Sequence, residues 1–491
     1  MLLFKINRKS ETPIYRQIIQ QIIELIEKDS LENGTILPST RELARKQGIN
    51  RTTIYRAYQE LAALGYVESR PGSYTRVRKR PRLFHQTQQS SRSIIDWSEQ
   101  CNPPSEELYR FFLSYSPEGE KEMPEGLINL SSLDPDSRLF PVKDFRRCLN
   151  QVLVNQGAKV LRYGEYGGYR PLREDIAQRL QIHGISISPD EILITNGAQQ
   201  AIELILKLFA QSGKSVAIES PTYANVLPLI RHHQLQVVEI PMGEEGMDLD
   251  MLKSRLEAQR PLFLYTIPNF HNPTGVTTSQ AHRETVLEIC ERYRVPVVED
   301  GFEEEMKYFG KVVLPIKSMD KNQIVLYLGT FSKVLFPGIR IGWIAAEREC
   351  IRRLLAIKRF VDLSGSSSIQ AALSSFLRQG YYDLHLKRIH RIFRKRMQVA
   401  LSSLKAYLPE NFSWTSPDGG YTIWVKSEQP FPEEGTFKQT LIKHGVLVSP
   451  GQYYYHSSPP RNYFRIAIAG LNEKEISQGI RRLGDALRAL N

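Results

Sequence analysis

Cysteine is scarce in this chain of 491 residues, which contains only four. They are scattered without close pairs, at Cys101, Cys148, Cys290 and Cys350. This spacing argues against a zinc site and against a disulfide framework. Long apolar runs are lacking too, because even the stretch from 201 to 210 contains two charged residues, so we expect no segment to span a bilayer. The first ten residues lack the apolar run of a signal peptide. These absences predict a protein of the reducing cytoplasm.

Acidic residues are also in short supply relative to basic ones. The chain has 65 Lys and Arg against 53 Asp and Glu, a formal net charge of +12. The excess is uneven, because residues 1–80 hold 15 basic and 8 acidic residues, a net charge of +7. Such a concentration favours a polyanionic partner over a general role in solubility. With 41% hydrophobic residues, the chain is otherwise typical of a globular protein long enough for two or more domains.

Three helical patterns occupy the first 64 residues. Isoleucines recur every four positions from Ile14 to Ile26, which predicts an amphipathic helix with one buried face. A second helix is predicted to start at a cap on Ser39, with Glu42 completing a capping box, and to end at Gly48. Asn50 is the predicted cap of a third helix.

The third predicted helix, residues 51–64, has an apolar face and a polar face. The predicted core-facing stripe is Ile54, Ala57, Leu61 and Leu64. The remaining face and the N-terminal end carry Arg51, Thr52, Thr53, Tyr55, Arg56 and Gln59. Arginine reads guanine edges in the major groove, and hydroxyls bind phosphates. Two helices joined by a short turn, with such a face on the second, are typical of a helix-turn-helix. A helical protein–protein module with a solvated basic face is the alternative.

A hairpin is predicted next, in which residues 66–69 pair with 74–77 around Pro71-Gly72-Ser73. The motifs LPSTRELA (37–44), RTTIYRAY (51–58), LGY (64–66) and RPGS (70–73) resemble the winged helix of the GntR superfamily over residues 12–78. Tyr74 departs from the pattern, because many relatives have a second wing glycine there. The resemblance implies a DNA-binding domain at 1–79, with double-stranded DNA as the partner. Its DNA-binding residues would be Arg41, Arg51, Thr52, Thr53, Tyr55, Arg56 and Gly72.

Residues 80–126 are predicted to be a flexible linker. The segment QTQQSS at 86–91 is polar and low in complexity. The more apolar segments 94–97 and 109–115 are candidates to dock on the larger domain.

From residue 127 onward, short apolar runs alternate with helical patterns. The runs are 192–195, 215–218, 236–240, 262–265, 296–298 and 324–328. This alternation predicts a large α/β domain at 127–491 with a mostly parallel central sheet. Ligands bind beyond the carboxyl ends of the strands in such sheets. Polar residues follow several of these runs: Asn196 to Gln199, Tyr223, Asn272, Asp300, and Thr330 to Lys333.

The loop GTFSKVLFPGIRIGW, at 329–343, carries the strongest chemical signal in the large domain. It presents two hydroxyls, on Thr330 and Ser332, together with Lys333 and Arg340. Hydroxyls and an arginine suit a phosphate, and a lysine among them suits a Schiff base. Taken alone, the pattern is also that of an ordinary polar loop.

Six motifs in order resemble the fold-type I pyridoxal-phosphate enzymes of the class I aminotransferase group. They are Tyr163-Gly164 with Gly168 and Leu172-Arg173, ESPTY (219–223), NFHNPTG (269–275), Glu299-Asp300, Ser332-Lys333 through Arg340 to Trp343, and FRIA (464–467). The resemblance covers about residues 127–490. It implies pyridoxal 5′-phosphate as cofactor, and a homodimer in which Tyr163 would reach the neighbouring subunit's phosphate.

The same resemblance implies a role for each matching residue. Lys333 would carry the cofactor as an internal aldimine and would be the catalytic residue. Asp300 would face the pyridinium nitrogen and Asn272 would donate to the ring 3′-oxygen, while Arg465 would bind a substrate carboxylate. Tyr223 would stack on the ring. The phosphate would be held by Ala198, Gln199, Thr330, Ser332 and Arg340.

Phe302 departs from the aminotransferase pattern, because many relatives have a tyrosine at this place that contacts the 3′-oxygen. Phenylalanine cannot donate that hydrogen bond. Its loss is expected to raise the pKa of the aldimine and to weaken the chemistry.

As a whole, the chain resembles the MocR/GabR-type subgroup of the GntR regulators, in which a winged helix is joined to an aminotransferase-like domain. The resemblance implies a transcriptional regulator, cytoplasmic and associated with the nucleoid, that senses pyridoxal phosphate or an amino compound as an aldimine at Lys333. Two alternatives stay open: a catalytically active aminotransferase with an appended DNA-binding module, and a storage or scaffold protein for the cofactor. If the regulator is also an enzyme, slow or partial transamination is expected.

Overall fold

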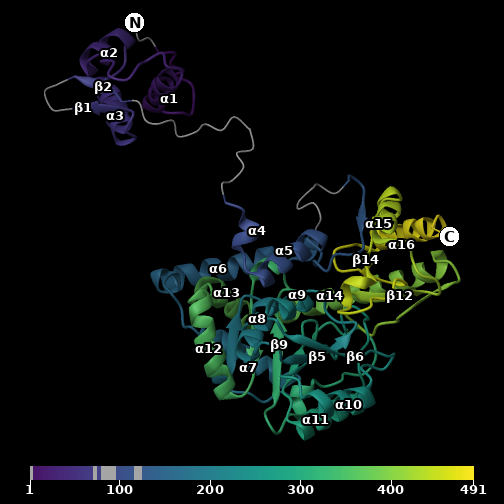
Figure 1. Ribbon diagram of the computed structural model, residues 1–491. Helices are drawn as coiled ribbons and strands as arrows, with labels where there is room; N and C mark the ends of the chain where they lie inside the picture. Colours follow the sequence, from purple (N-terminus) through teal and green to yellow (C-terminus); the bar gives the residue numbers. More distant parts are fainter. Residues whose placement is uncertain (1–3, 70–73, 79–94, 116–123, 491) are drawn as a thin grey trace. The chain divides into compact units, whose positions relative to one another are not determined.

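The computed structural model describes residues 4–69, 74–78, 95–115 and 124–490, which fall into two compact units, Met1–Asp96 and Trp97–Asn491 (Figure 1). Part of the predicted linker, 80–94 and 116–123, lies outside the described residues. The described part contains α4 (Trp97–Gln100) and α5 (Pro103–Tyr115), and α5 packs against α9 (Val226–His232). None of the helices in the described ranges is long and apolar enough to cross a membrane.

The first unit is three helices and a small antiparallel hairpin around one apolar core. Its elements are α1 (Ile14–Glu27), α2 (Thr40–Gln47), α3 (Arg51–Ala63), β1 (Val67–Ser69) and β2 (Thr75–Val77). Val67 pairs with Val77 in the hairpin, and both side chains enter the core beside the buried isoleucines of α1. The predicted hairpin strands are therefore confirmed, while the tip at 70–73 lies outside the described residues.

The predicted caps of α2 and α3 are present, with one exception. The Ser39 hydroxyl accepts from the Glu42 N–H at 3.2 Å, Gly48 ends α2 with a φ of 61°, and the Asn50 side chain accepts from the Thr52 N–H at 3.0 Å. The predicted capping box is wrong, because the Glu42 carboxylate binds Lys46 one turn later, at 2.6 Å.

The predicted core stripe of α3 also needs one correction. Leu64 is 43% exposed, because α3 ends at Ala63 and Leu64 is already its C-cap. Tyr58 lies in the core instead, at 4% exposure, and its hydroxyl donates to the Pro38 carbonyl at 3.0 Å. A tyrosine can be buried at low cost where its hydroxyl finds a partner.

The second unit is organised around a seven-stranded sheet of order β4-β10-β9-β8-β7-β5-β6. All its pairings are parallel except those of β10, which runs antiparallel to both neighbours. The mostly parallel sheet is thus confirmed, although β10, which begins within the 329–343 segment, was not among the predicted strands. The bounds are β4 (Ile192–Thr195), β5 (Ser215–Ser220), β6 (Gln236–Pro241), β7 (Leu264–Thr266), β8 (Val297–Asp300), β9 (Val325–Thr330) and β10 (Gly342–Ala345).

Helices cover this sheet and connect its strands (Figure 1). The helices α8 and α12 pack on the β4 end of the sheet, and α10 lies against β6. The longer helices of the unit are α6 (Val142–Gln156), α7 (Arg170–Ile182), α8 (Ala198–Phe209), α10 (Leu249–Gln259), α11 (Gln280–Tyr293), α12 (Arg348–Asp362), α13 (Ser367–Arg378) and α14 (Tyr381–Tyr407). The buried strands β4, β8 and β9 end at one edge, where Asn196, Asp300 and Thr330 lie.

A second, four-stranded antiparallel sheet of order β11-β12-β15-β14 forms the C-terminal part of the unit. Its elements, with the two helices that accompany it, are β11 (Phe412–Trp414), β12 (Thr422–Ser427), α15 (Glu434–Lys443), β14 (Ser449–Pro450), β15 (Tyr463–Ala467) and α16 (Glu473–Arg488). Val446–Leu447 (β13) pairs in parallel with Ile128–Asn129 (β3), so the segment that precedes the large sheet joins the C-terminal part of the unit.

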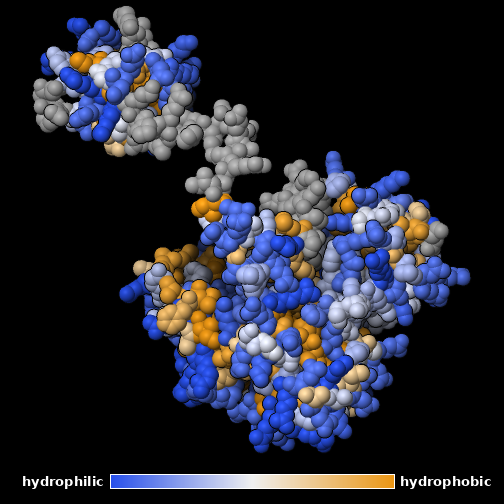
Figure 2. All heavy atoms as spheres, in the orientation of Figure 1, coloured by the Kyte–Doolittle hydropathy of each residue, from blue (hydrophilic) through white to orange (hydrophobic). Residues whose placement is uncertain are grey.

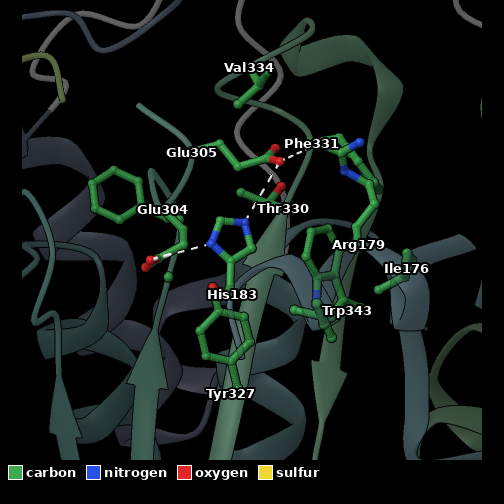
Figure 3. A pocket seen from close by; sticks show the side chains of 13 residues that line it. Ile176, Arg179, His183, Glu304, Glu305, Tyr327, Thr330, Phe331, Val334 and Trp343 are labelled. Atoms are coloured by element: carbon green, nitrogen blue, oxygen red, sulfur yellow. Dashed lines mark hydrogen bonds and ion pairs between the residues drawn. The ribbon is translucent and has the colours of Figure 1, made fainter. Parts of the chain in front are cut away.

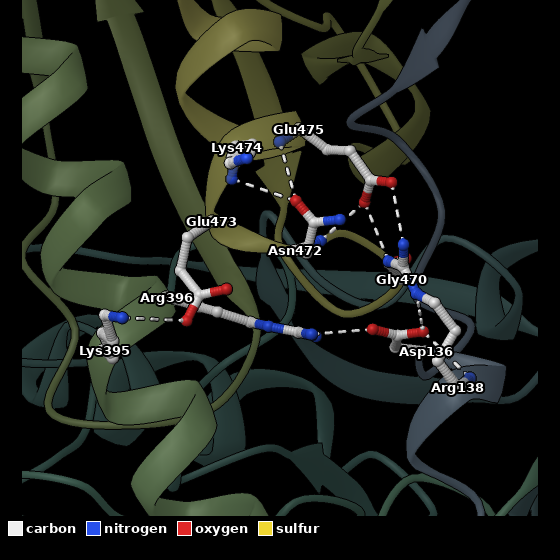
Figure 4. Close-up of polar contacts among 9 residues, drawn as sticks. All are labelled: Asp136, Arg138, Lys395, Arg396, Gly470, Asn472, Glu473, Lys474 and Glu475. Carbon is white, nitrogen blue, oxygen red and sulfur yellow. Dashed lines mark hydrogen bonds and ion pairs between the residues drawn. The ribbon is translucent and has the colours of Figure 1, made fainter.

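The segment after β3 is fixed by a network of ion pairs (Figure 4). The buried Asp136 accepts from Arg396 of α14 and from Arg138, both at 2.7 Å, and Arg138 in turn binds Glu475 of α16 at 2.8 Å. Burial alone would raise the pKa of the Asp136 carboxyl, but the hydrogen bonds from the two arginines hold that pKa below its usual value. These ion pairs anchor the segment that contains Asp136 and Arg138 to α14 and α16, two helices that are distant in sequence.

Candidate functional site

Ten residues predicted from the sequence line a single cavity of about 420 Å³. They are Ala198, Gln199, Tyr223, Asn272, Asp300, Thr330, Ser332, Lys333, Arg340 and Arg465. They come from the ends of β8 and β9, the loops after β5 and β7, the N-terminus of α8, the 329–343 loop and β15. The fold therefore brings together groups that span 268 positions of sequence, from 198 to 465.

Asp300 is the last residue of β8 and is almost fully buried. Its Oδ2 accepts from the Tyr265 hydroxyl at 2.7 Å, whereas Oδ1 is buried without a hydrogen-bond partner in the described parts of the chain. Burial raises the pKa of the Asp300 carboxyl to about 6, although the bond from Tyr265 opposes that shift. A buried carboxylate oxygen without a partner is costly, and a cationic hydrogen-bond donor at this place would remove the cost.

The residues after β9 form the floor of the cavity. The Thr330 hydroxyl donates to the Ile341 carbonyl at 3.1 Å and also lies 3.1 Å from Ser332 Oγ. Lys333 Nζ donates to the main-chain carbonyl of Leu133 at 3.1 Å. Burial lowers the pKa of the Lys333 amine, and the negative charge of Glu303 opposes this. A lysine with a lowered pKa is a better nucleophile at neutral pH.

Arg340 lies over the N-terminus of α8. Its backbone has a φ of 48°, and Nη2 donates to the Asn196 carbonyl at 2.6 Å. Gly197 makes this approach possible, because its φ is +86° and a Cβ there would lie 2.8 Å from the same guanidinium nitrogen. The guanidinium, the free N–H groups of the first turn of α8 and the hydroxyls of the floor together form a cradle suited to an anion.

Arg465 reaches the opposite side of the cavity from β15. Nη1 donates to Asn272 Oδ1 at 2.9 Å, and Nη2 donates to the Ser131 carbonyl at 2.5 Å. Asn272 is held by the loop in which the neighbouring His271, buried, contacts Thr274 Oγ1 at 2.8 Å and Glu219 Oε2 at 3.2 Å. His271 therefore supports the loop.

Two features of the cavity and its surroundings were not foreseen. Residues 131–134 form one wall and bond to both Lys333 and Arg465. The local sequence SSLD carries no motif that would have revealed this. Glu303 was also missed, because three consecutive glutamates, 303–305, are usually solvated, yet Glu303 is 1% exposed here.

Phe302 and Tyr163 lie in very different surroundings. The buried Phe302 lines the cavity, at the position where the aminotransferase pattern has a tyrosine. Tyr163 is 84% exposed and lies outside the cavity of its own chain.

The predicted DNA-binding face of the first unit is accessible. Arg41, Arg51, Thr52, Tyr55 and Arg56 are exposed and Thr53 is partly exposed, while Gly72 lies outside the described residues. Arg56 is engaged within the unit, because its guanidinium stacks on Tyr15 at 4.0 Å and binds Glu60 at 3.3 Å. Arg51, at the first position of α3, is better placed than Arg56 to contact DNA.

Two family models match the chain. The aminotransferase class I and II model matches residues 125–483, and the model for bacterial regulatory proteins of the gntR family matches 14–77. The chain is 31% identical to the uncharacterized HTH-type transcriptional regulator YisV of Bacillus subtilis, over 99% of this chain and 98% of that one. It is 34% identical to aromatic-amino-acid aminotransferase 1 of Thermococcus litoralis, over 74% of this chain and 88% of the other.

Among solved structures, the α-aminoadipate aminotransferase LysN of Thermus thermophilus, complexed with N-(5′-phosphopyridoxyl)-L-leucine, aligns with a TM-score of 0.74. It is 30% identical to the chain and covers 81% of it, and the alignment includes 99% of LysN.

Proposed function

We propose, from the premise that the chain belongs to the GntR-family regulators that carry a class I and II aminotransferase domain, that it binds an operator and senses pyridoxal phosphate or an amino compound. The observation that carries this proposal is that one chain aligns end to end with transcriptional regulators and also contains a complete aminotransferase-like cavity. The proposal places the protein in the cytoplasm, at the nucleoid.

Members of the aminotransferase family use pyridoxal phosphate, and the residues present fit this cofactor. The buried Asp300 Oδ1, which lacks a partner among the described residues, suits a protonated ring nitrogen. The cradle of Arg340, Ser332 and the first turn of α8 suits the phosphate, and Tyr223 lies in the cavity wall to stack on the ring. When bound, the cofactor supplies an electrophilic aldehyde carbon and a ring that accepts electrons.

Main-chain carbonyls hold the two cationic side chains of the cavity. Lys333 donates to the Leu133 carbonyl and Arg465 to the Ser131 carbonyl. A ligand that engages Lys333 and offers Arg465 a carboxylate replaces both bonds, because each cation then has a stronger partner. A regulator responds only if its ligand has different affinities for two conformations, and this exchange supplies such a difference.

A second candidate function is catalytic transamination. Lys333, Asp300, Asn272 and Arg465 all line the cavity, and the chain is 34% identical to an aromatic-amino-acid aminotransferase over most of that enzyme. Arg465 would then orient the carboxylate of an amino acid, and Lys333 would move its proton.

The purified full chain separates the two functions. We expect it to bind DNA from upstream of its own gene, with an affinity that changes on adding pyridoxal phosphate or amino acids, and Arg51→Ala is expected to weaken binding about ten-fold. Lys28→Ala, which removes an exposed charge at the C-terminus of α1, is the matched control and should leave affinity unchanged. Rapid multiple turnover of amino donor and keto acid, without sequence-specific DNA binding, would favour the enzyme.

Phe302→Tyr is expected to lower the pH midpoint of the absorbance change of the bound cofactor by about one unit. The added hydroxyl would donate to the 3′-oxygen and stabilise its negative charge, so the proton is lost at lower pH. An absorbance titration measures this directly. Phe302→Leu removes the ring without adding a donor, and a midpoint that moves equally in both variants would contradict the explanation.

We also propose that the second unit forms a homodimer through the side that carries α6 and α12, where hydrophobic residues gather in Figure 2. Val154, Tyr163 and Phe360 are each more than 80% exposed there, which is unusual for large apolar side chains. Phe360→Glu is expected to weaken the dimer by about 30-fold in sedimentation measurements. Leu384→Glu, at an exposed site on α14, is the control and should leave the dimer intact.

A further inference from the structure

The residues before α1 form an ordered arm on the surface of the first unit. Phe4 anchors the arm in the core of that unit, at 7% exposure. The side-chain amide of Gln21 donates to the Lys5 carbonyl and accepts from the Lys5 N–H, each at 2.9 Å. Gln17 forms the same pair of bonds with Asn7, at 3.0 and 2.9 Å. Two side chains of α1 therefore hold the backbone of the arm much as a neighbouring strand would.

The segment from the arm to the start of α1 runs beside α3, whose exposed face is the predicted DNA-binding face. At one end, Arg8 Nη2 donates to the Gly48 carbonyl at 3.0 Å, in the turn between α2 and α3. At the other end, the Tyr15 hydroxyl accepts from Arg56 Nη2 of α3 and from Arg16 Nε, both at 3.2 Å. Both ends of this segment are therefore fixed next to α3.

The segment carries an excess of positive charge that its own acids do not balance. Residues 4–16 contain four basic side chains and a single acidic one, Glu11. We call the three exposed basic side chains nearest α3, which are Arg8, Lys9 and Arg16, the flanking strip. Among the residues that the structure describes, no carboxylate forms an ion pair with the flanking strip.

A charged cluster in the second unit shows the contrast (Figure 3). There, the guanidinium of Arg179 forms an ion pair with Glu305, and the ring of His183 lies 4.0 Å from the Glu304 carboxylate. All four side chains line one small pocket, where each basic group faces an acidic one. Charges that only stabilise a fold are commonly paired in this way, whereas the flanking strip leaves its positive charges open to a polyanion.

We infer that the flanking strip binds phosphates of DNA along one edge of the major groove while α3 occupies the groove. An α-helix fits the major groove, and a sugar-phosphate strand then lies along each side of the helix. Lysine and arginine bind those phosphates without reading the bases. The flanking strip therefore adds affinity for any duplex, and α3 reads the sequence. This inference rests on the proposed function, because it assigns further residues to the same DNA-binding unit.

The test measures binding of the full chain to two DNA duplexes by fluorescence anisotropy at several salt concentrations. One duplex comes from upstream of the protein's own gene, and the other is a scrambled sequence of the same length and composition. Lys9→Gln and Arg16→Gln are each expected to reduce the slope of log affinity against log salt by about one. Together they should raise the dissociation constant about ten-fold for both duplexes at ~100 mM salt. Arg51→Ala, in contrast, should weaken binding to the upstream duplex more than to the scrambled one.

Two further variants separate charge from packing. Arg16→Lys keeps the positive charge beside Tyr15 and should keep the wild-type slope. Lys28→Gln removes one exposed charge at the other end of α1 and should match the wild type. An unchanged slope in the Lys9→Gln and Arg16→Gln double variant overturns the inference, and so does an equal reduction in Lys28→Gln. A loss in Arg16→Gln that Arg16→Lys does not recover has the same meaning, because packing would then explain it.

The same measurements distinguish failure of this inference from failure of the proposed function. If the wild type binds both duplexes equally, operator recognition fails, while reduced salt slopes in the variants still support the flanking strip. If the wild type prefers the upstream duplex and the variants keep its salt slope, the operator proposal stands and the flanking strip is refuted. A chain that binds neither duplex overturns both.

Discussion

The variant Lys333→Ala is expected to abolish the effect of pyridoxal phosphate and amino compounds on DNA binding, although the protein still binds DNA. Lys333 is the one lysine among the described residues that line the cavity, so no other side-chain amine there can replace it. The DNA-binding face belongs to a separate compact unit, which the substitution leaves intact.

Fluorescence anisotropy with labelled operator DNA, with and without ligand, measures this outcome. Lys311→Ala removes an exposed lysine of the same unit and serves as the control. A ligand response that persists in Lys333→Ala would mean that sensing does not pass through this amine, and the proposed function would have to be replaced.

Asp300→Asn is expected to have two large effects of opposite sign. Affinity for pyridoxal phosphate should fall on the order of 100-fold, because a neutral amide cannot hold a protonated ring nitrogen as a buried carboxylate does. Equilibrium binding of the cofactor, followed by absorbance or by quenching of tryptophan fluorescence, measures this loss.

Stability of the cofactor-free protein should move the other way. The folded-state pKa of Asp300 is about 6 against an ordinary value of 3.8, so folded protein retains a proton that the unfolded chain loses between about pH 4 and 6. Stability therefore falls as pH rises through that window and remains lower above it. Asp300→Asn removes this penalty and is expected to stabilise the protein at pH 7 by up to about 3 kcal/mol, with little gain at pH 4.

Denaturation curves at both pH values test the sign, with the exposed Asp250→Asn as control. Lower stability of Asp300→Asn at pH 7 would show that the carboxylate is a structural requirement. Weaker cofactor binding together with a more stable cofactor-free protein would show that Asp300 serves ligand binding and lowers the stability of the fold.

The sequence was most informative where local chemistry and strand order coincide. Asp300 and Thr330 end buried strands and Lys333 follows one, and parallel strands must bring their carboxyl ends to one edge. The exposed face of α3 could also be predicted, because helical spacing separates the buried Ile54 and Ala57 from the exposed Tyr55 and Arg56.

The parts that escaped prediction depend on tertiary contacts. Glu303 resembles a surface glutamate until Gly420 and Tyr421, more than a hundred positions later, enclose it. Residues 131–134 form a cavity wall beside Asp136, which is fixed by Arg396 of a helix distant in sequence. The Glu42 carboxylate could have bound either the Ser39 N–H, as in a capping box, or Lys46 one turn later. In the structure it binds Lys46.

The bonds from Lys333 and Arg465 to the 131–133 backbone have a consequence for which molecules can act on the protein. On the proposed function, an aldehyde bound at Lys333 and a carboxylate bound at Arg465 would each displace one carbonyl and leave the other bond in place. The segment would be released from both bonds only when both groups are bound. A full response would therefore require a bound carboxylate as well as a bound aldehyde.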